Sequence, residues 1–265
     1  MPALAQQQKS ISTEKKKLHG TFFLQWGYHR DAYTNSTIQF KDSETPNMPK
    51  YDFTFHNAKA QDQPDMDDLL NDPLTVPQYI LTGGYFFNDE HDLGVEVSWN
   101  HLKYVFTDNQ MLHMTGTIDG QSYDLDTLIT PQFVRFEHTN GNNYLIVSLL
   151  KRIPLLSSKN QIHILSANFR VGPGLLIPKT DSHITINNQE YHNDGPFRVS
   201  GWVIGVGAAL RYDFFKYFFL EPSIKGSFAD YTNVKLYEKG RANHTFFSVQ
   251  YILSAGINIP LGSGK

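Results

Sequence analysis

The chain has 265 residues, of which 40% are hydrophobic and 14% aromatic, and its formal net charge is −3 at pH 7. This balance offers no basic footprint for nucleic acid, and the absence of cysteine excludes disulfide scaffolds and thiol-based metal sites or catalysis. No run reaches the roughly 18 apolar residues of a transmembrane helix, so a helical membrane protein is excluded. A β-barrel is not excluded, because its alternating strands hide their lipid-facing side chains from averages along the sequence.

The first residues are polar and show no periodicity. Ala3-Leu4-Ala5, followed by three glutamines, is similar to the small-residue end of a secretory signal. We interpret residues 1–18 as the remnant of an export signal and a disordered tail, the alternative being a tail without a role. Residues 19–265 are expected to form a single β-barrel domain.

The first predicted strand covers residues 20–28, where apolar side chains occupy every second position. Residues 30–77 contain only short alternating pieces, such as 51–56, and we interpret them as a long loop that carries a small hairpin. A second strand follows at residues 78–87. The third begins at Leu93, and its apolar parity changes near Asn100, where we expect a β-bulge that turns His101 and Lys103 inward.

The middle of the chain is harder to divide into strands. Residues 108–132 are predicted to form a second long loop with some strand. For the fourth strand we favour residues 144–150, but ten strands result if 133–138 or 51–56 also pairs into the wall. The fifth strand is expected at residues 161–176, before a third long loop at 178–197.

Three further strands fill the last third, at residues 202–212, 218–228 and 247–259. They reach the roughly 9–11 residues with which a tilted strand crosses a bilayer. Aromatic residues gather around the turn at 213–217, as they do at a membrane–water interface. The sequence therefore predicts an all-β chain that forms a transmembrane, antiparallel up-and-down β-barrel of about eight strands, and a soluble all-β domain is the alternative.

The lengths of the connections agree with this topology. In chain order they run long, short, long, short, long, short and intermediate, and the short ones lie at residues 88–92, 153–160 and 213–217. Successive connections of an up-and-down barrel lie at opposite ends, so the short turns share one side of the membrane and the long loops share the other.

Residues 21–28, 78–87, 93–99 and 250–261 together resemble the small outer-membrane β-barrel proteins of Gram-negative bacteria, especially the Bacteroidetes-type outer-membrane β-barrel family. The resemblance covers nearly the whole chain from Gly20 and consists of patterns without signature motifs. It implies a bacterial outer-membrane location, with both chain ends and the short turns periplasmic and the long loops extracellular. The sequence departs from the family where it ends on Gly264-Lys265 in place of a terminal aromatic residue.

The inward-facing positions of the predicted strands carry polar side chains and charges of both signs. The set comprises Gln25, Glu96, Asn100, Arg170, Arg211, Glu221 and Lys225. An eight-stranded barrel has an interior just wide enough to be filled by side chains. We therefore expect a salt-bridged polar plug that stabilises the barrel, with a narrow polar or ion channel as the alternative.

Four histidines lie near the ends of predicted strands, where a hydrolase could meet lipid. They are His29, His56, His101 and His138. The sequence has no His-x-Ser, the spacing used by lipid A deacylases among barrel enzymes. A catalytic site assembled from distant segments would use His101 with Ser98 and Glu137.

The first long loop contains an acidic run. It comprises Asp62, Asp65, Asp67 and Asp68. Calcium binds such oxygen-rich segments, but the spacing lacks the glycine and the final glutamate of an EF-hand. We expect solvated loop charge, no metal and no cofactor.

The sequence thus predicts a non-enzymatic outer-membrane protein with a structural or surface-interaction role through loops 30–77, 108–132 and 178–197. The expected partners are outer-membrane lipid and lipopolysaccharide, with other outer-membrane proteins as a further option. An outer-membrane lipid hydrolase similar to lipid A deacylases, or a narrow channel, are the alternative functions.

Overall fold

The computed structural model describes residues 20–63, 77–87 and 91–261. The segment predicted to be an export-signal remnant lies outside these residues, as do Asp65, Asp67 and Asp68. Across the described ranges, no helix is long and apolar enough to cross a membrane.

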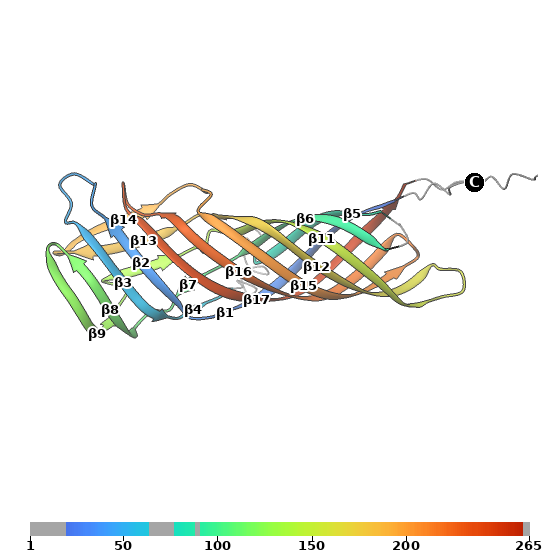
Figure 1. The fold of residues 1–265 in the computed structure, drawn as a ribbon, viewed down its shortest axis with the longest axis horizontal. Helices are drawn as coiled ribbons and strands as arrows, with labels where there is room; N and C mark the ends of the chain where they lie inside the picture. Colours follow the sequence, from blue (N-terminus) through green and yellow to red (C-terminus); the bar gives the residue numbers. More distant parts are fainter. Residues whose placement is uncertain (1–19, 64–76, 88–90, 262–265) are drawn as a thin grey trace, which may run out of the picture.

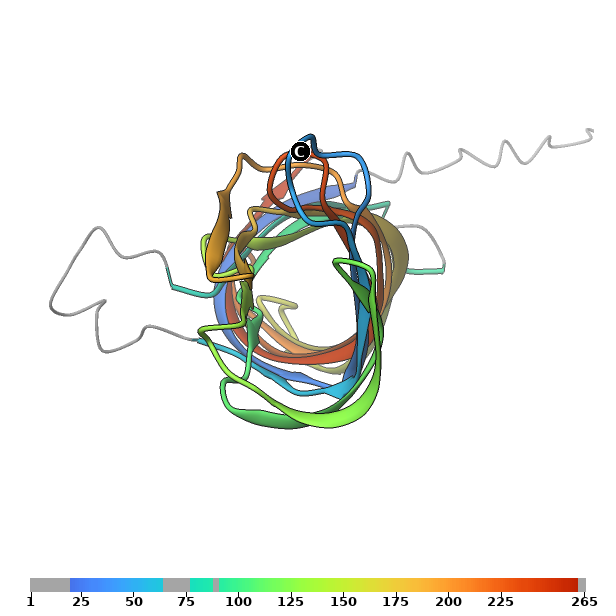
Figure 2. The same cartoon turned by 90° about the vertical axis from the view of Figure 1, so that its left-hand side faces the viewer.

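Eight antiparallel strands form a closed ring (Figures 1 and 2). In ring order they are β1 (Thr21–Tyr33), β5 (Tyr79–Phe86), β6 (Leu93–Leu102), β11 (Asn142–Ser157), β12 (His163–Pro178), β15 (Gly201–Phe214), β16 (Phe218–Lys235) and β17 (Arg241–Pro260). The ring closes where β1 pairs with β17 along its whole length, from Thr21 opposite Pro260 to Tyr33 opposite Ser248. The predicted antiparallel barrel is confirmed, with eight strands in its wall.

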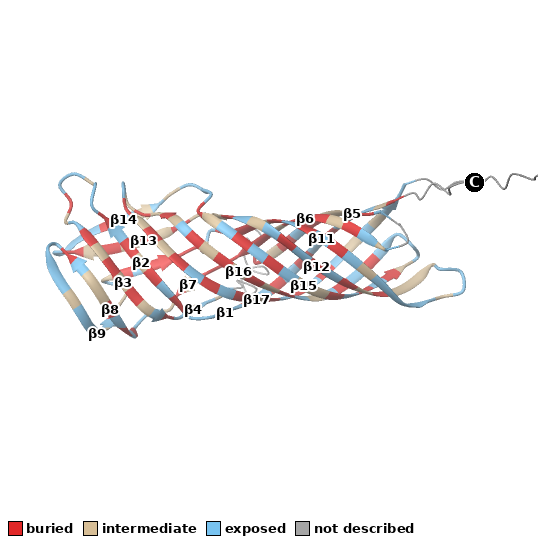
Figure 3. Ribbon diagram, in the orientation of Figure 1, coloured by how far each residue is buried: buried red, intermediate tan, exposed pale blue. Residues whose placement is uncertain are grey.

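The outer face of the ring is apolar and exposed. Trp26 is 49% exposed, Val206 57% and Leu253 63%, while most of the residues that alternate with the outward-facing ones along each strand are buried (Figure 3). A soluble protein rarely exposes an apolar patch larger than a few hundred Å². A band of this kind on every wall strand requires hydrocarbon as its solvent, so the ring is a transmembrane barrel.

Short turns and long connections lie at opposite ends of the barrel. The described residues of the turns at 87–92, 158–162 and 215–217 lie at one end, where the Leu261 backbone N–H also donates to the Gly20 carbonyl at 2.9 Å. The described residues of the connections at 34–78, 103–141 and 179–200 lie at the other end (Figure 1). This is the predicted arrangement, except that the last connection, at 236–240, is short.

The described parts of the long connections are folded and contain more strand than the sequence predicted. Four strands continue the barrel sheet beyond β17: β2 (Ser36–Asp42), β3 (Tyr51–Ala58), β8 (Gln110–Ile118) and β9 (Gln121–Ile129). A second sheet contains β4 (Ala60–Gln61), β7 (Val105–Phe106), β10 (Val134–Glu137), β13 (Asp181–Ile186) and β14 (Gln189–Asp194). We call these nine strands the extension.

The extension has an aromatic core that also fills the adjoining end of the barrel. Phe40 stacks on Phe53 with ring centroids 5.2 Å apart and meets Phe136 edge-on at 5.3 Å. All three rings are fully buried, and each such burial contributes about 2–3 kcal/mol of hydrophobic stabilisation. The same cluster of side chains includes Tyr144 and Phe246 of the barrel wall. Extension and barrel therefore share one core.

This shared core corrects the bulge expected near Asn100. β6 pairs with β5 and β11 without any shift of register as far as Leu102. Leu102 and Tyr104 are fully buried in the extension core, on the inward parity of Asn100. The apolar parity changes because the strand leaves the membrane: inside it the apolar face points to lipid, and beyond it the apolar face points to the core.

Two other strand assignments are settled by pairing. β10, within the predicted segment 133–138, pairs with β13 and β7. β3, which contains 51–56, pairs with β2 and β8. Neither enters the closed ring, so the ten-strand alternative is wrong.

Candidate functional site

The middle of the barrel holds a buried network of charges. Arg170 Nη2 donates to Glu221 Oε1 at 2.6 Å, and its Nε lies 3.8 Å from Glu96 Oε1. Asn168 Nδ2 donates to the other Glu221 oxygen at 3.0 Å. On the far side, Lys225 Nζ donates to Asn100 Oδ1 at 3.0 Å. These side chains come from the three strands β6, β12 and β16, and each is at least 93% buried.

The network is closed below, toward the short turns, by a layer that we call the aromatic floor: Phe23, Phe86 and Phe219. The Arg211 guanidinium lies over this floor, with Cζ 3.3 Å from the Phe219 ring centroid and 5.0 Å from that of Phe23. Arg211 Nε also donates to Asp213 Oδ1 at 3.1 Å. The cation is therefore held by a carboxylate and by aromatic faces, an arrangement that favours arginine over lysine.

The structure brings together five residues of the predicted polar interior: Glu96, Asn100, Arg170, Glu221 and Lys225. Arg211 lies on the side of them that faces the short turns, 4.0 Å from Glu221. Gln25 is buried in the wall, but its Oε1 has no hydrogen-bond partner among the described residues. Arg170, Arg211 and Lys225 lie among Glu96, Glu221 and Asp213, so opposite charges surround each other within the barrel.

The end of the lumen toward the extension is closed by stacked rings. His244 stacks on Tyr231 with centroids 4.5 Å apart, and His138 lies 5.8 Å from His244. Burial lowers the pKa of His138 to about 3, and burial followed by the nearby His138 lowers that of His244 well below its ordinary value. Both rings are therefore neutral and act as part of the aromatic core. The sequence did not single out His244, since an isolated histidine in an aromatic strand carries no distinctive signal.

The proposed catalytic residues contact different groups. Ser98 points into the lumen, where its hydroxyl accepts from Asn100 Nδ2 at 3.0 Å. His101 lies on the outer side of the same strand, stacked on Tyr79 at 5.0 Å and bonded to Asn143 at 2.8 Å. Glu137 in β10 binds Arg135 at 2.8 Å. The wall of the barrel separates Ser98 from His101, so these three side chains are not arranged as a triad.

The other histidines near strand ends also have partners. His29 Nδ1 lies 2.9 Å from Asp31 Oδ1, His56 bonds the Thr115 hydroxyl at 2.8 Å, and His138 bonds that of Thr180 at 3.0 Å. A histidine–aspartate pair supplies two of the three members of a hydrolytic triad, but the other contact of the His29 ring is not a serine hydroxyl. Its remaining ring nitrogen meets the Tyr79 carbonyl at 3.2 Å.

Of the acidic run, only Asp62 is among the described residues. Its Oδ2 accepts from Arg30 Nε at 2.7 Å and from the Asp31 backbone N–H at 3.1 Å. It therefore ties the first long connection to the rim of β1.

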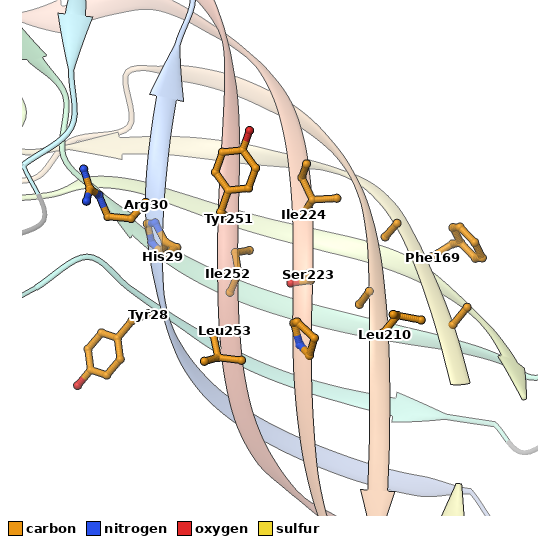
Figure 4. Close-up of a pocket in the computed structure, with 14 residues that line it drawn as sticks. Tyr28, His29, Arg30, Phe169, Leu210, Ser223, Ile224, Tyr251, Ile252 and Leu253 are labelled. Carbon is orange, nitrogen blue, oxygen red and sulfur yellow. The ribbon is translucent and has the colours of Figure 1, made fainter. Parts of the chain in front are cut away.

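A shallow groove crosses the lipid-facing side of β12, β15, β16 and β17 and reaches Tyr28 of β1. Small side chains, Ala167, Ala208 and Pro222, line it together with bulky ones such as Leu210 and Tyr251 (Figure 4). Its lining is almost entirely apolar, and it opens outward. Such a surface suits a hydrocarbon chain.

These features define the class: a transmembrane antiparallel β-barrel with a side-chain-filled interior and a folded extension at one end. No family model matches the chain, and no curated protein matches it.

Solved structures similar to the chain include three outer-membrane proteins. OprG from Pseudomonas aeruginosa is 10% identical with a TM-score of 0.38, and the match covers 92% of this chain and 97% of that one. AlkL is 11% identical with a TM-score of 0.36, covering 98% and 99%. Ail of Yersinia pestis is 12% identical with a TM-score of 0.32, covering 88% and 99%.

Proposed function

We propose that the chain is a bacterial outer-membrane protein that acts without catalysis, through contacts made by its extension outside the cell. The observation that carries this proposal is the shared core. Because the described parts of the long connections pack with the barrel end around one set of buried rings, these parts form a fixed surface in place of mobile loops.

The filled interior supports a role at the surface over a role as a channel. An ion would have to pass the aromatic floor, the charged network and the extension core in turn. Removing an ion from water into such apolar layers costs several kcal/mol or more. The buried charges are therefore best explained as a stabilising plug.

The hairpin β8–β9 is the part of the extension best placed for contacts. β9 ends the larger sheet, so one of its edges is unpaired, and most of its residues are exposed on both faces. Met111 and Leu128, directly opposite each other in the hairpin, are 66% and 50% exposed. Exposed edges and apolar pairs of this kind are typical of protein contacts.

The barrel wall itself would contact lipid. Its apolar band supports phospholipid and lipopolysaccharide acyl chains as partners, and the groove in Figure 4 offers one of them a defined position. In this orientation, the short turns and residues 20 and 261 face the periplasm.

The absence of cysteine allows a direct test by labelling. We would compare Ser122→Cys at the tip of β8–β9 with Ser157→Cys near a short turn, since both serines are exposed and the changes nearly isosteric. A membrane-impermeant maleimide should label the first variant on intact cells. It should label the second only after the outer membrane is permeabilised. Labelling of the second variant alone on intact cells would overturn the proposal.

A further inference from the structure

The hairpin β13–β14 gathers histidines and carboxylates on one face. Asn187 and Asn188 form its two-residue turn with φ of 52° and 63°, the left-handed conformation of a type I′ hairpin. This turn fixes the register that places His183 directly opposite His192. Asp181 lies two residues before His183 and therefore on the same face.

Three ligand atoms converge on this face. Asp181 Oδ1 lies 3.2 Å from His183 Nε2 and 3.1 Å from His192 Nε2, and all three atoms lie within 4.8 Å of one another. Zinc bonds of about 2.0–2.2 Å in a tetrahedron place neighbouring ligands roughly 3.3 Å apart. The distances from Asp181 Oδ1 to the two histidine nitrogens are close to the distance between two ligands of one metal ion.

A fourth side chain sets the chemistry of His183. Its Nδ1 is hydrogen-bonded to Glu190 Oε1 from the facing strand. When Nδ1–H donates to this carboxylate, the neutral ring turns the lone pair of Nε2 toward the Asp181 oxygen. That lone pair can bind a metal ion that Asp181 shares.

The His183 and His192 rings are stacked with centroids 4.1 Å apart and planes 16° from parallel, so both turn Nε2 toward the same Asp181 oxygen. One divalent ion satisfies all three ligands at once.

We propose that Asp181, His183 and His192 bind one divalent transition-metal ion, with Glu190 as the outer partner that orients His183. Two imidazoles and one carboxylate, with a remaining position open to water, are a ligand set suited to zinc. The side chains are 20–49% exposed, so an ion can reach them from solvent. This site lies in the extension, at the end of the molecule opposite the short turns (Figure 1), and the inference does not depend on the proposed surface role.

The chain provides its own control. His113 lies between Asp124, 3.2 Å from its Nε2, and Asp126, 2.9 Å from its Nδ1. The two carboxylates contact opposite nitrogens of a single ring, so they cannot join that histidine around one ion. His113 is thus an exposed histidine with acidic neighbours and without a convergent site.

The test is calorimetric titration of zinc chloride into tag-free, full-length barrel in detergent micelles. We expect one saturable site per chain, no loss of affinity in His113→Ala, and at least about a 100-fold loss in His183→Ala and His192→Ala. Glu190→Gln should weaken binding by about 10-fold, as typical of an outer partner. Cobalt should give the visible absorption of a tetrahedral ion in the wild type and not in His192→Ala.

Two results would overturn the proposal. One is the lack of saturable binding at zinc concentrations up to about 100 μM, which corresponds to a binding free energy of about −5.5 kcal/mol. The other is binding that survives in the His183→Ala/His192→Ala double variant. If an alanine variant fails to fold, Asp181→Asn, which keeps the size of the side chain, takes its place in the test. This variant should bind zinc about 10-fold or more weakly than the wild type.

Discussion

Glu221 is the residue on which the charged network depends most. It accepts hydrogen bonds from Arg170 and Asn168 and lies 4.0 Å from Arg211. Two cations from neighbouring strands thus share one carboxylate in a dry environment. Breaking such a buried pair from one side is costly because the remaining charge stays buried.

We therefore expect Glu221→Gln to lower the free energy of unfolding by about 3 kcal/mol, measured by denaturant unfolding in lipid vesicles. The matched control is Lys41→Met, which breaks an ion pair whose partners are 54% and 39% exposed. That change should leave the free energy of unfolding nearly unchanged, because water and salt screen an exposed ion pair. Equal, small losses in both variants would show that the network contributes little.

A second prediction concerns His244 and the effect of pH on the stability of the fold. Neither of its ring nitrogens has a hydrogen-bond partner among the described residues. Burial holds the pKa of His138 at about 3 and that of His244 well below its ordinary 6.5. At pH values between the lowered pKa of the folded state and about 6.5, the unfolded chain binds protons that the folded chain does not. The free energy of unfolding therefore falls as the pH drops below about 6.5.

His244→Phe should weaken this dependence, because it removes one of the two histidines while keeping a ring in the aromatic core. Unfolding curves at about pH 7.5 and pH 5 should show a smaller difference for the variant than for the wild type. At the higher pH the variant should be more stable by about 1 kcal/mol, since an unsatisfied buried polar group is lost. An unchanged difference between the two pH values would contradict the assignment.

At the scale of the strand, close backbone approach limits what the wall can accept. A methyl group on Gly172 in β12 would collide with the Val147 carbonyl oxygen of β11. A methyl group on Gly226 would come no nearer than 4.0 Å to its closest neighbour, Val206 Cγ2. Gly172→Ala should therefore slow or prevent insertion, scored by the heat-dependent shift in gel mobility of folded barrels, while Gly226→Ala should fold as the wild type does. Normal folding of both would refute the steric argument.

The wall strands could be predicted from sequence because lipid imposes a strict alternation. Trp202, Ile204 and Val206 must face hydrocarbon, so the residues between them face inward, and pattern alone gives strand and side. The same logic failed beyond the membrane. At Leu102 and Tyr104 the inward face is the apolar one, and the change of solvent was mistaken for a bulge.

The extension and its metal ligands could be predicted only in part. The alternation of Tyr51, Phe53 and Phe55 indicated strand, but nothing local showed that it would pair with β2 and β8. The pairing of His183 with His192 depends on the hairpin turn at Asn187-Asn188, a signal that the sequence contains. Their convergence with Asp181 is a property of the folded hairpin.

The molecule as a whole consists of two regions with opposite polarity. Within the barrel the outer face is apolar and the interior is polar, whereas in the extension the core is apolar and the surface is mostly polar, apart from exposed side chains such as Met111 and Leu128. The regions meet where Tyr144, Tyr231 and Phe246 lie across the barrel end. The charged network is consequently enclosed between this layer and the aromatic floor, and both closures are built into the core that holds the chain together.

The measurement that tests this account most directly is the conductance of the purified barrel in planar lipid bilayers. The enclosed interior predicts a quiet membrane, without discrete current steps, under conditions in which a known porin inserted in parallel conducts. Steady unitary steps that change their ion selectivity in Glu221→Gln or Lys225→Met would show that ions pass the charged network, and would contradict the account.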